Sequence, residues 1–311
     1  SILITPKIRQ YGIKRNIIDR FEERKSNKVL KVRIGGVSLL LSFLITIIFI
    51  FFILKQYIFL NPTEINYLTL IILGSILYSL IGLLDDIKSL SPFIRLIFQF
   101  SISIFVWYGG LRIESLNIDI ANILISEIDL PSYMSILFTT VWIVGLINAF
   151  NWLDGLDGLS SSIGVIISTT ILLIGLGSNN SFLCLTTTAL IGSTIGFLKY
   201  NIYPSKIIMG DSGSYLIGFL LSVFGIISTF NLNNQTNLFL ILSLFSLPIG
   251  DMVYVIIKRI VQLKSPFYPD RNHIHFRLID KGYLETKAAK KIVQICLING
   301  LVSLLIFFVT S

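Results

Sequence analysis

Charged residues are scarce in this chain of 311 residues. Lys, Arg, Asp and Glu make up 14% of it, against about 25% in an average soluble protein. Hydrophobic residues make up 54%, and the mean hydropathy is +0.82. The deficit argues against a water-soluble chain and predicts an integral membrane protein.

Several other features are rare or absent. The two cysteines, Cys184 and Cys296, lie in apolar runs at a spacing that fits neither a metal nor a redox site. No GxxxxGK[ST] loop and no GxSxG motif occurs, so the sequence favours neither a P-loop NTPase nor a serine hydrolase. No polar linker divides the chain, so we expect one membrane domain over residues 1–311. No cleavable signal peptide is visible, and because the chain begins with Ser1 rather than Met, we expect further sequence before it.

What the sequence does contain is long apolar runs. A helix needs about 20 mostly apolar residues to cross a bilayer. Nine such runs predict an all-α polytopic bundle of about ten transmembrane helices, nine full spans and a truncated first one ending in "SILIT". The predicted spans are roughly 34–54, 67–84, 93–108, 133–150, 158–177, 182–198, 212–229, 238–257 and 291–309.

The net charge of +8 is distributed unevenly between the predicted loops. If the spans alternate in direction, 23 of the 25 Lys and Arg residues fall on one side, and only Lys55 and Arg112 fall on the other. Such a bias marks the cytoplasmic side of a cell membrane protein, here an inner or plasma membrane. We therefore attribute the positive charge to membrane sidedness rather than to a nucleic-acid partner.

The polar motifs fall on that same side. The stretch "NAFNWLDGLDGL" places Asn148, Asn151, Asp154 and Asp157 three residues apart between two apolar runs. Their side chains would align only in a 3₁₀-helix. One interpretation is a polar interhelical turn. The other is a set of oxygen ligands for Mg²⁺ and of acceptors for a nucleobase, because Mg²⁺ prefers oxygen ligands and no Cys or His accompanies the motif.

Two further motifs end or begin a predicted span. Asp85 and Asp86 close "GLLDD", where two carboxylates oppose the helix dipole, so a functional role competes with a merely solvated helix end. "MGDSGS" predicts a helix start. Asp211 or Ser212 could simply be its N-cap, or the helix start could bind an anion beside a metal held by Asp211.

The last basic loop contains both histidines, in "PDRNHIHF". Two histidines are a weak zinc signal, so Arg271, His273 and His275 are better interpreted as a phosphate clamp. The alternative is a basic loop attracted by anionic lipid. Asp251, in the second half of the eighth predicted span, points toward the same side.

These motifs together predict a site that binds a metal–diphosphate substrate from the cytosol and a lipid from the bilayer. Two other classes stay open at this point. An ion-coupled membrane transporter would place its acids near the membrane midplane, often between inverted repeats. A non-catalytic lipid-binding scaffold would not need several polar motifs on one side.

The ordered motifs "IDRFEERK" with "RIGG", "GLLDD", "NAFNWLDGLDGL", "GFLKYNIYPSKIIMGDSGS" and "PDRNHIHF" resemble those of the polyprenyl-phosphate N-acetylhexosamine-1-phosphate transferases, the MraY/WecA superfamily. The match covers nearly the whole chain, and "RNHIH" is more similar to the WecA-like branch. The resemblance implies transfer of N-acetylhexosamine-1-phosphate, GlcNAc-1-phosphate above all, from a UDP-sugar to polyprenyl (undecaprenyl) phosphate. UMP leaves, and the product begins a cell-envelope glycan such as lipopolysaccharide or a cell wall polymer.

The resemblance also implies residue roles. It makes Asp85 and Asp86 a catalytic pair and Asp211 a catalytic Mg²⁺ ligand with Asn151, with Mn²⁺ as an alternative ion. It assigns substrate binding to Asp157, Asn201, Arg271, His273, His275 and Lys25. The interpretation of the Asn/Asp motif as acceptors adds Asn148 and Asp154 to the predicted substrate-binding residues. The chain departs from the family pattern near Lys25, which lacks the family's Pro and His, and at Phe276, which replaces a histidine. The sequence leaves the oligomeric state open, with a homodimer as one alternative to a monomer.

Overall fold

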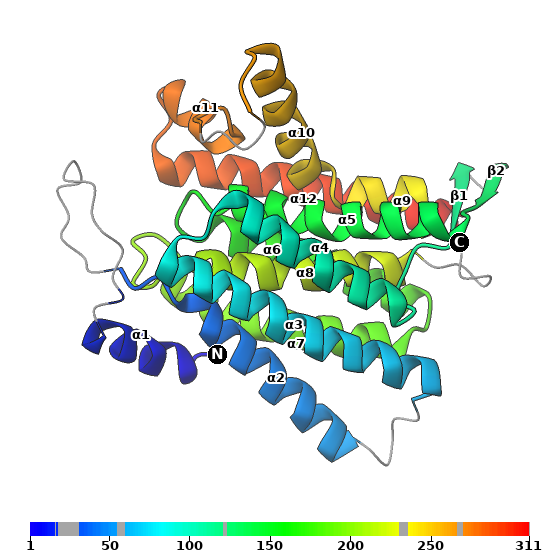
Figure 1. The fold of residues 1–311 in the computed structure, drawn as a ribbon, viewed down its shortest axis with the longest axis horizontal. Helices are drawn as coiled ribbons and strands as arrows, with labels where there is room; N and C mark the ends of the chain where they lie inside the picture. The colour runs from blue at the N-terminus through cyan, green and yellow to red at the C-terminus, as the bar shows by residue number, and fades with distance from the viewer. Residues whose placement is uncertain are drawn as a thin grey trace.

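The structure, a computed structural model, describes residues 1–15, 17, 31–54, 60–120, 123–229, 236–265 and 270–310. Helices dominate it and lie side by side in a bundle, with a small sheet at one end (Figure 1). In chain order the elements are α1 (Ile4–Lys14), α2 (Gly35–Leu54), α3 (Pro62–Lys88), α4 (Pro92–Tyr108), β1 (Ser115–Ile120), β2 (Ile123–Asp129), α5 (Ser132–Leu153), α6 (Leu159–Gly177), α7 (Ser181–Asn201), α8 (Gly210–Ser228), β3 (Thr236–Asn237), α9 (Leu238–Leu244), α10 (Ser246–Val261), α11 (Ile274–Asp280) and α12 (Glu285–Thr310).

The short polar connections determine where several helices begin. Asn61 accepts a hydrogen bond from the amide of Glu64, whose carboxylate accepts one from the amide of Asn61, and Pro62 opens the first turn of α3. This is a capping box with proline at a position that needs no amide hydrogen. Ser91 and Asn180 cap α4 and α7 in the simpler way, with one side-chain oxygen each.

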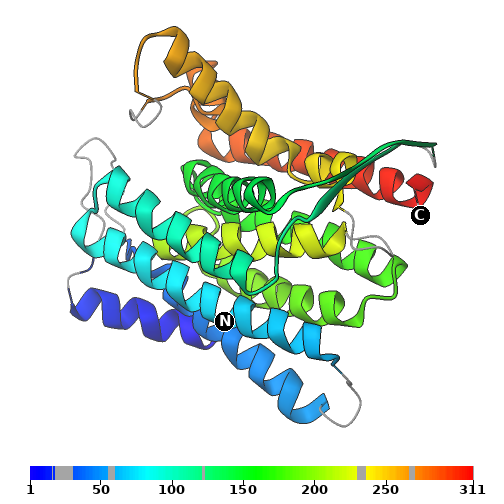
Figure 2. The same ribbon diagram turned by 45° about the vertical axis from the view of Figure 1, so that its right-hand side comes forward.

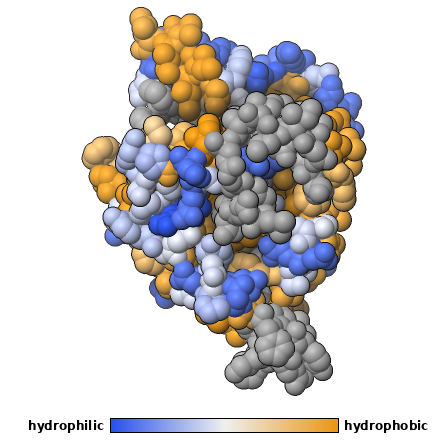
Figure 3. Space-filling model, turned by 90° about the vertical axis from the view of Figure 1, so that its right-hand side faces the viewer, coloured by the Kyte–Doolittle hydropathy of each residue, from blue (hydrophilic) through white to orange (hydrophobic). Residues whose placement is uncertain are grey.

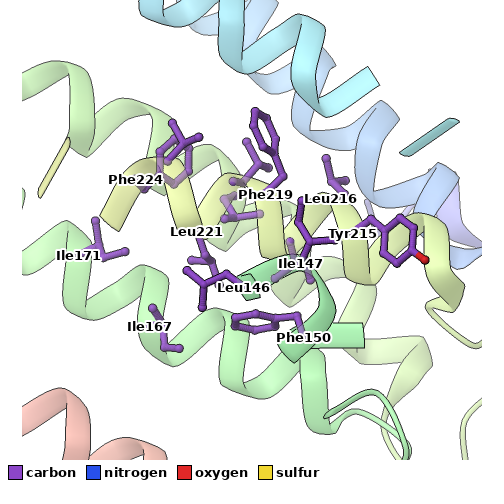
Figure 4. Packing of buried hydrophobic residues seen from close by; sticks show 14 of the residues in the cluster. Leu146, Ile147, Phe150, Ile167, Ile171, Tyr215, Leu216, Phe219, Leu221 and Phe224 are labelled. Carbon is purple, nitrogen blue, oxygen red and sulfur yellow. The ribbon is translucent and has the colours of Figure 1, made fainter. Parts of the chain in front are cut away.

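Helix α8 runs through the middle of the bundle and is buried along almost its whole length. Figure 4 shows Phe150 of α5 and Ile167 of α6 on one side of α8, beside Leu221, with Phe219 on its other side. Lipid tails are as apolar as leucine, so helices in a bilayer associate through close packing more than through exclusion of water. The position of α8 therefore depends on how closely its neighbours approach.

Two glycines permit the closest approach at the N-terminal end of α8. A Cβ atom at Gly36 of α2 would overlap the backbone nitrogen of Gly213, and one at Gly82 of α3 would overlap the backbone carbonyl of Asp211. Any larger residue would push α2 or α3 away from the start of α8. These glycines bring the ends of three helices together, and the candidate site lies there.

All nine predicted apolar segments contain helices, but the predicted count of about ten spans is not confirmed. In the described part of the chain, six helices are long and apolar enough to cross a membrane: α3, α5, α6, α7, α8 and α12. The apolar parts of α2 and α4 are shorter, and α9 with α10 makes a seventh span only as a bent pair. Residues 4–14, most of them assigned from sequence to a basic loop, form the separate helix α1.

The predicted continuous span 238–257 was wrong, because α9 and α10 meet at a bend of 79°. Pro248 explains the position of the break. It has no amide hydrogen to give to the carbonyl of Leu244, four residues earlier, and its ring clashes with that carbonyl. Helix α9 ends at Leu244, and α10 leans away from the bundle (Figure 2).

The expectation of an all-α chain also needs correction. Strands β1 and β2 form an antiparallel hairpin, and β3 pairs with β1 in parallel. The sheet lies at the end of the bundle opposite to the N-terminus of α8 (Figure 1). Figure 3 looks onto that end, where hydrophilic residues cover much of the described surface. Alternation of Leu116 and Ile118 with polar neighbours was the signal for a strand.

The glycine contacts predict a stability difference between two matched substitutions. Gly36→Ala should destabilise the protein by about 1–3 kcal/mol or more, because the added methyl group meets backbone rather than a movable side chain. Gly192→Ala, on an open face of α7 with no atom within 4 Å, should be neutral or stabilise by about 0.5–1 kcal/mol. Thermal unfolding of the detergent-solubilised variants measures the difference. Equal melting temperatures would contradict the proposed packing.

Candidate active site

The N-terminus of α8 is capped by a different helix. Asp86, in the last turns of α3, accepts hydrogen bonds from the amides of Asp211 (2.9 Å) and Ser212 (3.0 Å). The N-cap residue Met209 provides no such bond. Asp86 thus satisfies two of the amides that every helix start leaves unpaired, and its charge lies at the positive end of the helix dipole. The alternative in which Asp211 or Ser212 is the N-cap of α8 was wrong, because the N-cap is Met209. The amides of Asp211 and Ser212 donate to the Asp86 carboxylate.

Arg33 lies beside this cap. Residues 32–36 run alongside residues 207–209, joined by hydrogen bonds from the amide of Ile208 to the carbonyl of Val32 (2.9 Å) and from Gly35 to Ile208 (3.0 Å). This pairing places the guanidinium of Arg33 3.1 Å from Asp86 and 3.9 Å from Asp211. One cation therefore lies between two carboxylates from α3 and α8.

Asn151 reaches the same cluster from α5. Its side-chain amide donates to Asp211 Oδ1 (2.7 Å) and to Ser214 Oγ (3.1 Å). The two residues assigned to a metal from the sequence, Asp211 and Asn151, are therefore neighbours in space. If the amide of Asn151 turned over, its oxygen would face the position that its nitrogen now occupies.

Asp85 has partners in both α4 and α8. Its carboxylate accepts hydrogen bonds from Arg95 (2.9 Å), from the amide of Leu90 (2.8 Å) and from the Tyr215 hydroxyl (3.3 Å). The side chain is 4% exposed. The two members of the predicted catalytic pair thus make different contacts. Asp86 binds the first amides of α8, and Asp85 binds Arg95, Leu90 and Tyr215.

The second half of "NAFNWLDGLDGL" forms a loop after α5. Asp157 accepts two hydrogen bonds from Lys31 (2.7 and 2.9 Å) and one from the amide of Ser205 (3.0 Å). Burial raises the pKa of Asp157, but these hydrogen bonds outweigh burial, and the net pKa lies below its usual value. Asp157 therefore ties the loop to the segments that flank α2 and α8.

Asp154, the residue directly after α5, is a third carboxyl group near Asp211 and Asp86. Burial raises its pKa well above the usual range, and the charges of Asp211 and Asp86 raise it further, while Arg33 acts in the opposite direction. Acidic neighbours favour the protonated form of a carboxyl group, and a nearby cation favours the charged form. Asp154, Asp211 and Asp86 thus form an acidic cluster in which Arg33 is a neighbouring cation.

Two residues predicted to bind substrate instead make hydrogen bonds that connect parts of the protein. Asn148 donates from its amide to the Gln99 side chain (2.8 Å) and to the carbonyl of Val144. Asn201 is buried, donates to the carbonyl of Ile207 (3.0 Å) and accepts from Ser161 (2.8 Å). The 3₁₀-helix that would align the four polar side chains of the motif does not form, because α5 remains α-helical through Leu153.

The described end of the basic loop and α11, residues 270–280, form an arm that packs on the loop after α5. His273 precedes α11 in an extended conformation, and His275 lies in its first turn. Their rings are parallel within 6° and 5.8 Å apart. The His273 ring lies 5.4 Å from that of Trp152, and a Cβ atom at Gly155 would overlap Nε2 of His275. The arm thus adjoins the segment that carries Asn151 and Asp154.

The other predicted clamp residues differ in position. Arg271 is exposed, pairs with Asp280 (3.2 Å) and lies over the Phe276 ring at 4.9 Å. The phenylalanine that replaces a family histidine therefore contacts a predicted phosphate-binding arginine. Lys25 lies outside the described residues.

Sequence reasoning gave no role to three basic residues of the site: Arg33, Lys31 and Arg95. Each pairs with a carboxylate from a distant part of the chain: Asp86, Asp157 and Asp85, respectively. A usable signal was their scarcity, since a basic residue next to an apolar run in so uncharged a chain usually has an acidic partner.

The donor set fits a magnesium ion better than a zinc ion. In the described part of the chain, no three His, Cys, Asp or Glu residues are grouped as a ready-made metal cage. Mg²⁺ commonly uses one or two carboxylates and takes its other ligands from water and substrate phosphates. Asp211 beside Asn151, with the carboxyl groups of Asp154 and Asp86 nearby, meets that description.

The fold and this cluster define a class: a polytopic membrane protein with an acidic site at one end of its helix bundle. Comparison with known sequences specifies it further. The family described as glycosyl transferase family 4 matches residues 68–229. The chain therefore belongs to this family, within the MraY/WecA superfamily that its motifs resemble.

Three relatives illustrate the similarity. A probable undecaprenyl-phosphate N-acetylglucosaminyl 1-phosphate transferase of Bacillus subtilis is 30% identical over 281 residues, 90% of this chain and 75% of the relative. An undecaprenyl-phosphate alpha-N-acetylglucosaminyl 1-phosphate transferase of Thermotoga maritima is 31% identical over 275 residues, 88% and 77% of the two chains. A phospho-N-acetylmuramoyl-pentapeptide-transferase of Staphylococcus haemolyticus is 26% identical over 314 residues, 97% and 93%.

The capping contacts predict opposite stability effects for two neighbouring aspartates. Asp86→Asn should destabilise the protein by about 1–3 kcal/mol, because the new amide group would face a backbone amide and leave it without an acceptor. Asp211→Asn should leave stability unchanged or higher, because it removes a charge next to Asp86. Thermal unfolding in detergent separates the two variants, and equal losses would contradict the capping role.

His275 predicts an acid-sensitive stability. Burial, and next the neighbouring His273, lower the pKa of His275 to about 4. Because the unfolded chain titrates near pH 6.5, it binds the proton first, so the folded state loses stability as the pH falls from about 6.5 to about 4. The loss is on the order of 3 kcal/mol. His275→Phe should flatten the melting temperature over this range, and an unchanged pH dependence would contradict the assignment.

Proposed function

We propose that this protein transfers N-acetylglucosamine-1-phosphate from UDP-N-acetylglucosamine to a polyprenyl phosphate in the membrane. A phosphate oxygen of the lipid attacks the sugar-linked phosphorus, the bond from that phosphorus to UMP breaks, and a polyprenyl-diphosphate sugar forms. The proposal is supported by relatives that are named as transferases of this kind and by the composition of the site. An undecaprenyl chain is the expected lipid, and the product would begin a cell-envelope glycan.

The observation that carries the proposal is the meeting of distant acidic and basic motifs at one end of the bundle. Asp211 contacts Asn151 from α5 and lies near Arg33 from the segment before α2. The histidine arm packs on the adjoining loop. Phosphoryl transfer needs in-line positioning and neutralisation of charge more than covalent help from the protein. An acidic metal-binding side beside a basic phosphate-binding side supplies both.

A bound magnesium ion would neutralise the phosphates of the donor and stabilise the leaving UMP. Asp211 would hold it, with Asn151 as a neutral oxygen ligand and Asp154 as an adjacent charge. Mn²⁺ is an alternative ion. The arm residues Arg271, His273 and His275 would contact the diphosphate, and Asp157 would keep the loop in place through Lys31.

A dedicated general base is not needed for the attacking group. The second pKa of a phosphate monoester is about 6, so the lipid phosphate is mostly dianionic at neutral pH. Asp85 already accepts hydrogen bonds from Arg95, Leu90 and Tyr215. Its contacts favour a positioning role at the junction of α3 and α4 over proton abstraction.

The orientation of the site follows from the distribution of charge. Of the 25 Lys and Arg residues, 23 belong to the segments on the side of the polar motifs. Basic loops remain in the cytoplasm during membrane insertion, so we assign the site to the cytoplasmic face. The transporter alternative finds no support, because the acids gather at one end of the bundle rather than at its middle.

A transfer assay tests the proposal. Membranes containing the protein are incubated with radiolabelled UDP-N-acetylglucosamine, Mg²⁺ and undecaprenyl phosphate, and the label in the organic extract is measured. We expect lipid-linked label that disappears when UMP is added in excess. Label that accumulates only inside sealed vesicles would instead indicate transport, and a panel of other UDP-sugars defines the donor.

Asp211→Asn should lower the rate of this transfer by about 100-fold or more at saturating Mg²⁺, because an amide is a poor substitute for an anionic magnesium ligand. Asp129→Asn, on the exposed end of β2 at the opposite end of the bundle, is the matched control and should retain the wild-type rate. A near-normal rate for Asp211→Asn would remove this residue from the metal site.

A further inference from the structure

Asp251 is a buried carboxylate that the proposed reaction does not use. It lies in α10, is 5% exposed, and faces the start of α11. Three donors converge on it. Its Oδ2 lies 2.9 Å from Nδ1 of His273, and its Oδ1 accepts hydrogen bonds from the amide of Ile274 (2.7 Å) and from Arg277 (3.3 Å).

This contact determines which nitrogen of His273 carries a proton. A carboxylate only accepts hydrogen bonds, so the ring nitrogen that faces it must be the N–H. In a neutral imidazole the opposite nitrogen, Nε2, is then an acceptor, and in the cation it is a second donor. Asp251 therefore fixes both the tautomer and the direction of the ring.

The surroundings of the ring connect it to the candidate site. His273 lies 5.4 Å from the Trp152 ring, next in sequence to Asn151. It lies parallel to the ring of His275, which packs against Gly155 in the loop after α5. Arg277, also bound to Asp251, lies over the Tyr254 ring at 4.0 Å. The carboxylate thus links α10, α11 and the histidine that borders the loop.

We propose that Asp251 is a positioning residue, which holds His273 with its Nδ1 proton toward α10 and its Nε2 edge toward the donor diphosphate. The tautomer assignment depends only on the geometry above. Its effect on the rate rests on the proposed transferase function. Asp251 itself need not touch the substrate.

An Asn at this position should reverse the tautomer. Two donors face Oδ1 and only one faces Oδ2, so the oxygen of an Asn side chain would stay with Ile274 and Arg277. Its NH₂ group would then face Nδ1 of His273, which must become the acceptor, and the proton would move to Nε2. Asp251→Glu keeps a carboxylate and should preserve the original tautomer.

Nitrogen-15 NMR of histidine-labelled protein in nanodiscs at alkaline pH reads the tautomer directly. The chain has only two histidines, and His275→Phe leaves a single ring to assign. We expect Nδ1–H for His273 in the wild type and in Asp251→Glu, and Nε2–H in Asp251→Asn. Asp270→Asn, which alters a carboxylate bound to Arg259 and Asn272 in the same arm, is the matched control and should leave the tautomer unchanged.

Kinetics complete the test. In the transfer assay, Asp251→Asn should lower kcat by about 10- to 100-fold while the KM for the donor changes by less than about threefold, and Asp251→Glu should recover part of kcat. A wild-type His273 that carries its proton on Nε2 would overturn the proposal even if no variant folds. A reversed tautomer with kcat within about twofold of wild type would also overturn it.

Failure of the transferase proposal would be recognised separately. If the wild-type protein transfers no sugar phosphate, the tautomers of the wild type and of Asp251→Asn still decide whether Asp251 positions His273, because the spectra need no substrate. A reduced rate in Asp251→Asn with an unchanged tautomer would overturn the positioning role, because the rate would then not depend on which nitrogen of His273 carries the proton.

Discussion

The site depends on one interaction, the capping of α8 by Asp86 of α3. A helix start buried among other helices has no water to satisfy its amides, and each unpaired amide would cost about 1–3 kcal/mol. Asp86 supplies two hydrogen bonds and a charge at the positive end of the dipole, and Arg33 balances that charge. The same contact sets the direction of Asp211, because its amide is one of the two groups held.

The cap in turn requires close packing of backbone. Gly36 and Gly82 let α2 and α3 approach the first turn of α8, and the pairing of residues 32–36 with residues 207–209 delivers Arg33 to the carboxylates. A larger residue at either glycine would push α2 or α3 outward, and Arg33 and Asp86 would then separate. Packing and charge are therefore not independent features of this site.

The sequence predicted the helices well because apolar length is a local property. The family resemblance implied one metal site for Asp211 and Asn151, and the two side chains are hydrogen-bonded neighbours. The sequence did not predict the 79° break before α10, although Pro248 was a readable signal, or the three-stranded sheet. The partners of Asp86, Asp157 and Asp251 could not be predicted, because each contact joins residues far apart in sequence. The local pattern does not specify which basic side chain or backbone amide will contact a given carboxylate.

Depth along α5 explains why similar residues acquired different contacts. Asn148 lies one turn inside the bundle, where a polar side chain without a partner is costly, and it pairs with Gln99 of α4. Asn151 lies a turn nearer the helix end and meets Asp211 and Ser214. Beyond the helix, Asp157 pairs with Lys31. Each step of three residues thus places the next polar side chain further from the apolar interior. The surroundings at each depth decide its contact: Asn148 braces two helices, Asn151 joins the acidic cluster, and Asp157 holds the loop.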